Sequence, residues 1–309
     1  MFDKPTLHSL TQCEPSPELS LRLQTLAPRP AGRRRQGERI AAECFNAKRV
    51  AWNGYLKEAK KAGLFTPDLL SRLRGPDPSN FRSAMSECLA AWFFSTRLGA
   101  AVGPGLPSGR GLPDLTVRLL DGEAVCEVKA PYRAKPRALS FFQLDDDHAA
   151  LEASVDEANR QLSPGRNVVF LVPSLRVPVR PDDLERVFIA RPVFHVPVIL
   201  DQKTRPEDLP PPRFGHVTDR KLTKVWGKEG PRFKRTSVLL CVEEQLYSGL
   251  SPSIEVVHWC HVVHNPYASK QISRESFGAY PQFVKVEEPD KWSWIGSMGL
   301  EAGTYLGSC

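Results

Sequence analysis

The sequence lacks several features that would place it in common classes of protein. No stretch approaches the roughly 18 consecutive apolar residues of a membrane-spanning helix. The N-terminal stretch MFDKPTLHSLTQCEPSPELS also lacks the basic-then-apolar order of a secretory signal peptide. We therefore expect a cytoplasmic protein with no membrane partner, and the hydrophobic content of 41% is that of an ordinary folded chain.

Short catalytic and ligand-binding signatures are also missing. The absence of GxxxxGKS/T argues against an ATP-driven motor, and no GxSxG, HExxH or zinc-finger spacing occurs. The chain has 7 cysteines, an odd number, and no two of them form a CxxC pair. We therefore expect no disulfide framework.

Positive charge is concentrated in two blocks. Residues 31 to 75 hold eleven Lys or Arg and four Asp or Glu, and residues 203 to 235 hold ten and four. The formal net charge is +7, so the rest of the chain must sum to −6. Two basic blocks around a more acidic middle favour a protein that binds a polyanion near a carboxylate-lined centre. Two solvated faces are the alternative explanation.

Hydrophobic periodicity and turn residues predict a succession of helices and strands. The expected helices cover about 33 to 62, a short segment after Pro67, 81 to 98, and 147 to 162. The expected strands are 114 to 120, 124 to 130, NVVFLVP at 167 to 173, SVLLCV at 237 to 242 and IEVVHWCHVV at 254 to 263. This order predicts an α/β fold with a mixed central β-sheet flanked by helices. The expected regions are an N-terminal arm and basic helical region (1–77), a core (78–200), and a Pro-rich basic connection with a C-terminal extension that adds strands (201–309).

One acid is conspicuous in the helix expected at 81 to 98. Between Ala84 and Phe94 this helix carries a single charged residue, Glu87. A helix this apolar should be buried on most sides, where an isolated carboxylate is rare. Glu87 is therefore a candidate site residue.

A second group of charges lies in the stretch GLPDLTVRLLDGEAVCEVKAP. Asp121 and Gly122 form a strong hairpin-turn signal between two strands. Because side chains alternate along a strand, Glu127 and Lys129 share one face, and the hairpin brings Asp114 to the same edge of the sheet. Two adjacent carboxylates repel each other, and a hard divalent cation such as Mg²⁺ removes that repulsion.

The spacing of these residues resembles a known pattern. PD at 113–114, twelve intervening residues and EVK at 127–129 resemble the PD-(D/E)xK nuclease superfamily, which has the restriction-endonuclease-like fold. The family's order is helix, strand, hairpin strand, helix and strand, with a glutamate often supplied by the first helix. The resemblance covers about residues 79 to 175 and implies a restriction-endonuclease-like core within the α/β fold.

The resemblance also implies a role for each residue of the motif. Asp114 and Glu127 would ligate Mg²⁺ or Mn²⁺, with the Val128 carbonyl as a further ligand. Glu87 would bind a second ion or hold a metal-bound water. Lys129 would serve the attacking water.

Further candidates follow the motif in the chain. Some family members have a glutamine in the next helix, where Gln161 is the best match, and an ordinary solvent-facing residue is the alternative. The intervening loop carries Arg133, Lys135 and Arg137 beside Tyr132, where a phosphate backbone would approach. An ordinary solvated loop is the alternative for these residues.

Two C-terminal clusters offer weaker alternatives. The stretch HWCHVVH places His258, Cys260 and His264 on one strand face, where they could ligate zinc, although closed zinc sites usually draw on two separated pairs. Trp292 and Trp294 could stack on bases or pack against the rest of the chain.

The sequence therefore predicts a metal-dependent endonuclease that hydrolyses phosphodiester bonds, with DNA as the expected substrate and defence or mobile-element biology as the expected setting. We also expect the chain either to form a homodimer or to bind a targeting protein. One alternative is a nucleic-acid-binding module of the same fold without significant catalysis. The other is an unrelated protein in which the motif is a coincidence.

Overall fold

A computed structural model gives the structure of residues 31–107, 111–131, 144–173, 179, 184, 187–188, 192–195, 213–216, 226–227, 230–231, 233–248, 254–285 and 292–295. Residues 1 to 30 of the expected N-terminal arm, and the basic loop expected after the motif, lie outside the described residues.

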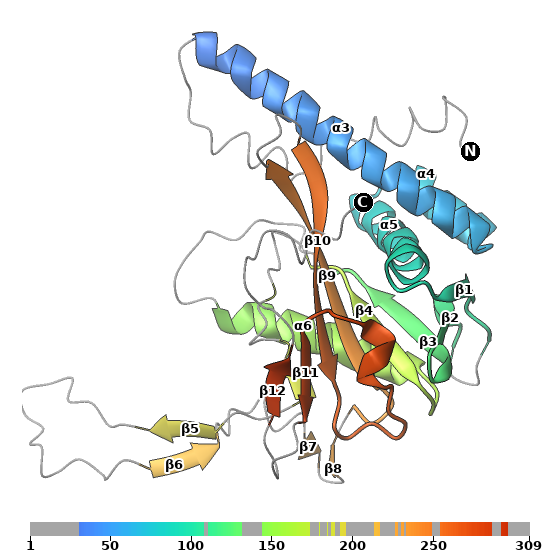
Figure 1. Cartoon of the computed structure of the whole chain (residues 1–309), viewed down its shortest axis with the longest axis vertical. Helices are drawn as coiled ribbons and strands as arrows, with labels where there is room; N and C mark the ends of the chain where they lie inside the picture. Colours follow the sequence, from blue (N-terminus) through green and yellow to red (C-terminus); the bar gives the residue numbers. More distant parts are fainter. Residues whose placement is uncertain are drawn as a thin grey trace, which may run out of the picture.

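An eight-stranded sheet forms the centre of the molecule, with the strand order β1-β2-β3-β4-β9-β10-β11-β12 (Figure 1). Its strands are β1 (Ala101–Pro104), β2 (Leu115–Leu119), β3 (Gly122–Lys129), β4 (Asn167–Leu171), β9 (Val238–Ser248), β10 (Ile254–His264), β11 (Gln282–Lys285) and β12 (Trp292–Ile295). Two separate pairs of short strands are β5 (Pro192–His195) with β6 (Arg213–His216) and β7 (Trp226–Gly227) with β8 (Gly230–Pro231).

Helices cover both faces of this sheet. They are α3 (Ala31–Lys61), α4 (Pro67–Arg74), α5 (Pro78–Trp92) with the π-helical turn η1 (Phe93–Arg97), α6 (Leu144–Gln161) and the 3-10 turn η4 (Arg274–Phe277). The helices α3, α4 and α5 pack on one face and α6 on the other (Figure 1). No helix among the described residues combines the length and apolar character that crossing a membrane requires.

The sheet is mixed in direction. The neighbours β3, β4 and β9 run parallel, whereas β1, β2 and β3 are joined by antiparallel pairings, as are β9 and β10. The crossover from β3 to β4 runs through α6, as parallel neighbours require. The expected α/β fold with a mixed central sheet flanked by helices is therefore confirmed, and the expected C-terminal strands join the same sheet.

Strand β4 separates two hydrophobic cores. Val168 and Phe170 pack in the core formed with α3, α4 and α5, whereas Val169 and Leu171 pack in the core formed with α6. All 5 residues of β4 are buried. A strand covered by helices on both faces needs apolar side chains on both, which explains the continuous apolar run in this segment.

Helix α5 lies next to the sheet and begins at a capped end. The Asp77 carboxylate accepts a hydrogen bond from the Ser79 amide at 2.9 Å, which satisfies one of the free donors of the first turn. At its other end the helix changes to the π-helical turn η1, where Phe93 and Phe94 are both buried and their ring centroids lie 5.9 and 5.8 Å from that of Phe170. The predicted helix over 81 to 98 is thus present, with a change of helix type near its end.

The predicted hairpin between β2 and β3 is present, but its turn is displaced by one residue. Leu119 pairs with Gly122, so Leu120 and Asp121 form the turn and Gly122 opens β3 with a φ of 109°. The Asp121 carboxylate accepts a hydrogen bond from the Ser273 amide at 2.7 Å. This contact comes from a segment 152 positions away in the chain, so local turn propensities do not reveal it.

We predict that Phe170→Ala lowers the free energy of unfolding by about 3–5 kcal/mol, because it removes a fully buried ring and leaves a cavity between β4 and α5. Urea unfolding followed by circular dichroism measures this change. Leu120→Ala is the control, since that side chain is 75% exposed and its loss should change stability by less than about 0.5 kcal/mol. Equal effects of the two substitutions would contradict the assignment of β4 to the core.

Candidate active site

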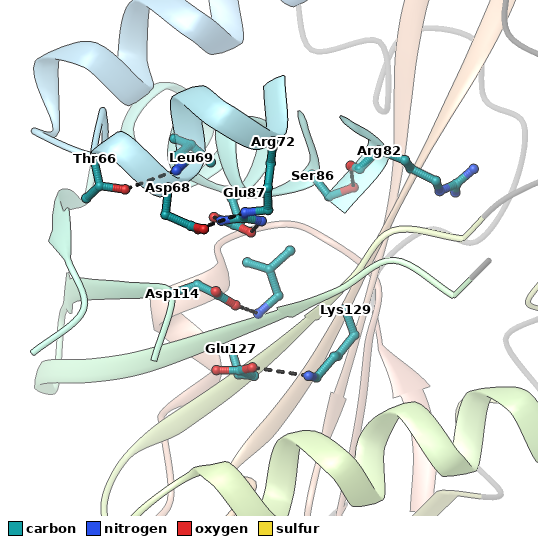
Figure 2. A network of polar contacts seen from close by, with 11 residues as sticks. Thr66, Asp68, Leu69, Arg72, Arg82, Ser86, Glu87, Asp114, Glu127 and Lys129 are labelled. Carbon is teal, nitrogen blue, oxygen red and sulfur yellow. Dashed lines mark hydrogen bonds and ion pairs between the residues drawn. The ribbon is translucent and has the colours of Figure 1, made fainter. Parts of the chain in front are cut away.

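Charged side chains from several elements gather beside one edge of the strands β2 and β3 (Figure 2). Glu87 comes from α5, Asp114 is the residue before β2, and Glu127 and Lys129 come from β3. The register explains the position of Asp114, because Leu115 pairs with Cys126 and the preceding residue therefore lies beside Glu127. The hairpin thus brings an acid from each strand to the same place, as expected.

Glu87 is buried and forms an ion pair. The residue is 8% exposed, and the Arg72 guanidinium donates to both carboxylate oxygens, at 2.5 and 3.0 Å. Arg72 comes from α4 and also donates through Nε to Asp68 at 2.9 Å. Burial raises the pKa of Glu87 to about 7, with the hydrogen bond from Arg72 opposing the rise and the charge of Asp114 adding to it.

Asp114 makes a hydrogen bond to the main chain of β3. Its Oδ2 accepts from the Val128 amide at 2.7 Å, which holds the carboxylate against the strand. Burial raises the pKa of Asp114 to about 7, and the nearby charge of Glu127 adds to that rise. The hydrogen bond from Val128 acts in the opposite direction without cancelling it.

Glu127 and Lys129 lie on the same face of β3, as alternation along the strand predicts. Glu127 Oε1 lies 3.2 Å from Lys129 Nζ. Glu127 is only 5% exposed, and its second oxygen, Oε2, is buried without a hydrogen-bond partner among the described residues. Burial raises the pKa of Glu127, although the charge of Lys129 opposes the change. A buried carboxylate oxygen is normally hydrogen-bonded or paired with a cation, and Glu127 Oε2 has neither among the described residues.

Helix α6 supplies two further acceptors for the amine of Lys129, in addition to Glu127 on β3. Lys129 Nζ donates to Glu157 Oε1 at 2.8 Å and to Gln161 Oε1 at 3.0 Å. Glu157 and Gln161 are four residues apart, so they lie on one face of the helix. The structure therefore brings Gln161 into contact with the motif lysine, whose position is set by one acceptor on its own strand and two on α6.

The three carboxylates do not converge on a single point. Among the described residues, no three His, Cys, Asp or Glu side chains form a group that could hold a metal ion. Two of the acids have donors within the protein, since Arg72 binds Glu87 and the Val128 amide binds Asp114. Glu87 and Asp114 are coupled through their charges, as are Asp114 and Glu127.

Two residues of this cluster were not predicted from the sequence. Glu157 had a usable signal, because it precedes Gln161 by one helical turn and so shares its face. Arg72 had none, since its partner Glu87 lies in another helix 15 positions further along the chain. Only the packing of α4 on α5 brings the two side chains together.

Other candidate residues lie elsewhere. Tyr132, Arg133, Lys135 and Arg137 fall outside the described residues, so their proposed contact with phosphate stays a prediction. The same holds for the side chains of Trp292 and Trp294, which belong to β12.

The histidine cluster of β10 does not form a zinc site among the described residues. His258 Nε2 contacts the Tyr55 hydroxyl at 2.5 Å, whereas His264 Nε2 contacts Gln282 Oε1 at 2.8 Å. The two rings therefore have separate partners, one in the middle of the strand and one at its end. Cys260, which lies between them, is buried in the core.

The cluster has the chemistry of a site for a hard cation. Its oxygen donors are carboxylates, which Mg²⁺ and Mn²⁺ prefer. Burial raises the pKa of all three acids, and the charge of a neighbouring acid adds to each rise. Such perturbed groups are concentrated at functional sites, although ion-pair networks also produce them. No protein-family model, curated protein or solved structure matches the chain.

We predict that Asp114→Asn makes stability less sensitive to pH in metal-free buffer. The pKa of Asp114 is about 7 in the folded protein and about 4 in an unfolded chain, so the folded state binds the additional proton between these values. The free energy of unfolding of the wild type should therefore fall as the pH rises from about 4 to about 7. Asparagine keeps an acceptor for the Val128 amide and cannot ionise, so the variant should gain on the order of 2 kcal/mol relative to the wild type over this range.

Urea unfolding in EDTA at about pH 5 and about pH 8 measures this difference. Glu123→Gln is the matched control, since Glu123 is an exposed acid on the same strand. A stability difference between Asp114→Asn and wild type that stays constant with pH would contradict the raised pKa.

Proposed function

We propose that the chain is a Mg²⁺- or Mn²⁺-dependent nuclease of the PD-(D/E)xK type, with a restriction-endonuclease-like core made of α5, β2, β3, α6 and β4. The element order supports this proposal, because a helix with a buried glutamate precedes the hairpin, and a helix and a parallel strand follow it. The observation that carries it is the position of Asp114 beside Glu127 and Lys129, from two strands and at one edge.

The residues of the cluster fit a divalent cation. Glu127 Oε2 is a buried carboxylate oxygen with no hydrogen-bond partner among the described residues, and a cation would supply the interaction that it lacks. Asp114 and Glu127 would hold the ion, with the Val128 carbonyl as a further donor. The amide of Val128 already positions Asp114, so the ligand set would need little rearrangement on that side.

The chain's own residues would then orient the reaction. A bound Mg²⁺ supplies positive charge that activates a water molecule and stabilises the leaving oxygen of a phosphodiester. Lys129 would hold that water or the developing negative charge on the phosphate, since its amine lies beside Glu127. Gln161 and Glu157 keep the amine in place, so its position does not depend on substrate. In this scheme Gln161 is a positioning residue.

The charge distribution supports nucleic acid as the substrate, and we propose DNA. The basic block at 31 to 75 includes α3 and α4, and α4 carries Arg72 next to the site. Lysine and arginine supply the sequence-independent attraction to phosphates that such a nuclease needs. We further propose that residues 133 to 137 contact the substrate, and that a second copy or a targeting protein sets its specificity. A role in defence or mobile-element biology remains our expectation for the setting.

A nucleic-acid-binding module without significant catalysis is the second candidate. One observation favours it: Arg72 neutralises Glu87, which leaves fewer acids free for a metal ion than the family pattern implies. Both candidates predict salt-dependent binding to DNA, but only the nuclease predicts metal-dependent cleavage.

We predict that the purified chain cleaves plasmid or linear DNA in Mg²⁺ or Mn²⁺ and loses this activity in EDTA. Asp114→Asn, Glu127→Gln and Lys129→Met should each lower the cleavage rate by about a hundredfold or more, because each removes a charge from the reacting centre. The rate of disappearance of intact DNA on a gel or in a fluorogenic assay measures the effect.

Glu123→Gln serves as the control, since it removes an exposed acid from the same strand without touching the cluster. Cleavage that survives Asp114→Asn or Lys129→Met would exclude this site as its source. Salt-sensitive DNA binding with no cleavage in either metal would favour the binding module.

A further inference from the structure

We propose that Arg72 is a built-in cation of this site that takes the place of a second metal ion beside Glu87. In this arrangement the chain binds one divalent ion, and Arg72 contacts a phosphate oxygen of the substrate. The inference rests on the proposed nuclease function. It concerns how many ions the site takes and which residue contacts the phosphate, so the two proposals can fail separately.

The geometry of Arg72 supports this role. Its two terminal nitrogens donate to the two oxygens of Glu87, at 2.5 and 3.0 Å, in the planar fork that a guanidinium forms with a carboxylate. A metal ion on Glu87 would have to share both carboxylate oxygens with that fork and lie close to the positive charge of Arg72. The pair is also anchored, because Arg72 Nε donates to Asp68 at 2.9 Å. Glu87 is therefore committed to an internal cation in the structure.

Arg72 also retains the means to bind an anion. A guanidinium has five N–H groups, and the bonds to Glu87 and Asp68 use three of them, which leaves two. The side chain is 25% exposed, whereas that of Glu87 is 11% exposed, so the open side of the pair belongs to the arginine. The two N–H groups without a partner among the described residues lie one on each terminal nitrogen, so each can donate a single hydrogen bond. A phosphodiester that approaches from solvent could accept one of them through a phosphate oxygen.

A purely structural role for the ion pair is the competing explanation. The pair joins α4 to α5, and breaking a partly buried pair destabilises a fold whether or not it serves chemistry. Stability measurements alone therefore do not separate the two roles. The number of bound metal ions and the affinity for DNA do separate them, since a structural tie would move neither.

The test is titration of the metal-free protein with Mn²⁺ by isothermal calorimetry, without nucleic acid. We expect about one ion per chain in the wild type and also in Glu87→Gln, because Glu87 is not a ligand while Arg72 holds it. Arg72→Ala should bind a second ion, since it frees the Glu87 carboxylate. Affinity for short duplex DNA in Ca²⁺ should fall by at least about tenfold in Arg72→Ala, because a charge-assisted contact is lost.

Arg160→Ala is the matched control, since Arg160 is an arginine on α6 whose side chain is 71% exposed and pairs with Asp156. It should leave both the number of ions and the DNA affinity unchanged. Circular dichroism and the melting temperature show whether Arg72→Ala folds, and Glu87→Gln gives an independent measurement if it does not.

Two bound ions in the wild type, falling to one in Glu87→Gln, would overturn the inference while leaving the nuclease proposal intact. A lower melting temperature of Arg72→Ala with unchanged ion number and DNA affinity would make Arg72 a structural tie only. No Mn²⁺ binding and no cleavage by the wild type would reject the proposed function itself.

Discussion

The structure of the site depends on one constraint: three carboxylates lie close enough to interact, and two of them, Glu87 and Glu127, are buried while Asp114 is half-buried. Burial raises the pKa of Glu87, Asp114 and Glu127, and the acids raise one another's pKa further through their charges. Arg72 and Lys129 offset part of this cost but not all of it. The fold can accommodate the remaining electrostatic cost because each acid lies in or next to an element that packs in an extensive apolar core. Such a local excess of negative charge attracts cations.

The sheet makes the arrangement possible by sorting side chains according to position. In β3, Ala124, Cys126 and Val128 pack under α5, whereas Glu127 and Lys129 point toward α6. The same strand therefore contributes to the core with one face and to the site with the other. The Val128 amide also connects the two faces, because it donates to Asp114 while its side chain packs in the core. A shift of one residue in the β2–β3 register would turn both charges toward the core under α5 and the apolar set toward α6.

Much of this arrangement follows from local pattern, and the rest depends on packing between distant segments. Alternation places Glu127 and Lys129 on one face of β3, and the apolar run at 167 to 171 predicts a central strand. The lone acid of α5 is buried, as its neighbours indicate. The contact between Arg72 and Glu87 could not be predicted, because no periodicity relates residues of two different helices. The hairpin turn was predicted one residue too late, and the hydrogen bond from the Ser273 amide to the Asp121 carboxylate could not be predicted, since it comes from the far end of the chain.

The pairing of β4 with β9 limits where this chain could be truncated. On its other side β4 pairs with β9, which comes from the segment beyond residue 200, and Val168 to Leu171 lie opposite Val238 to Cys241. A fragment truncated before β9 would therefore keep the charged cluster but turn its most apolar strand into an open edge. Unpaired backbone donors and acceptors along such an edge recruit other chains, and the fragment would be prone to aggregate. The smallest unit able to support the carboxylate cluster thus extends well past the motif that marks it.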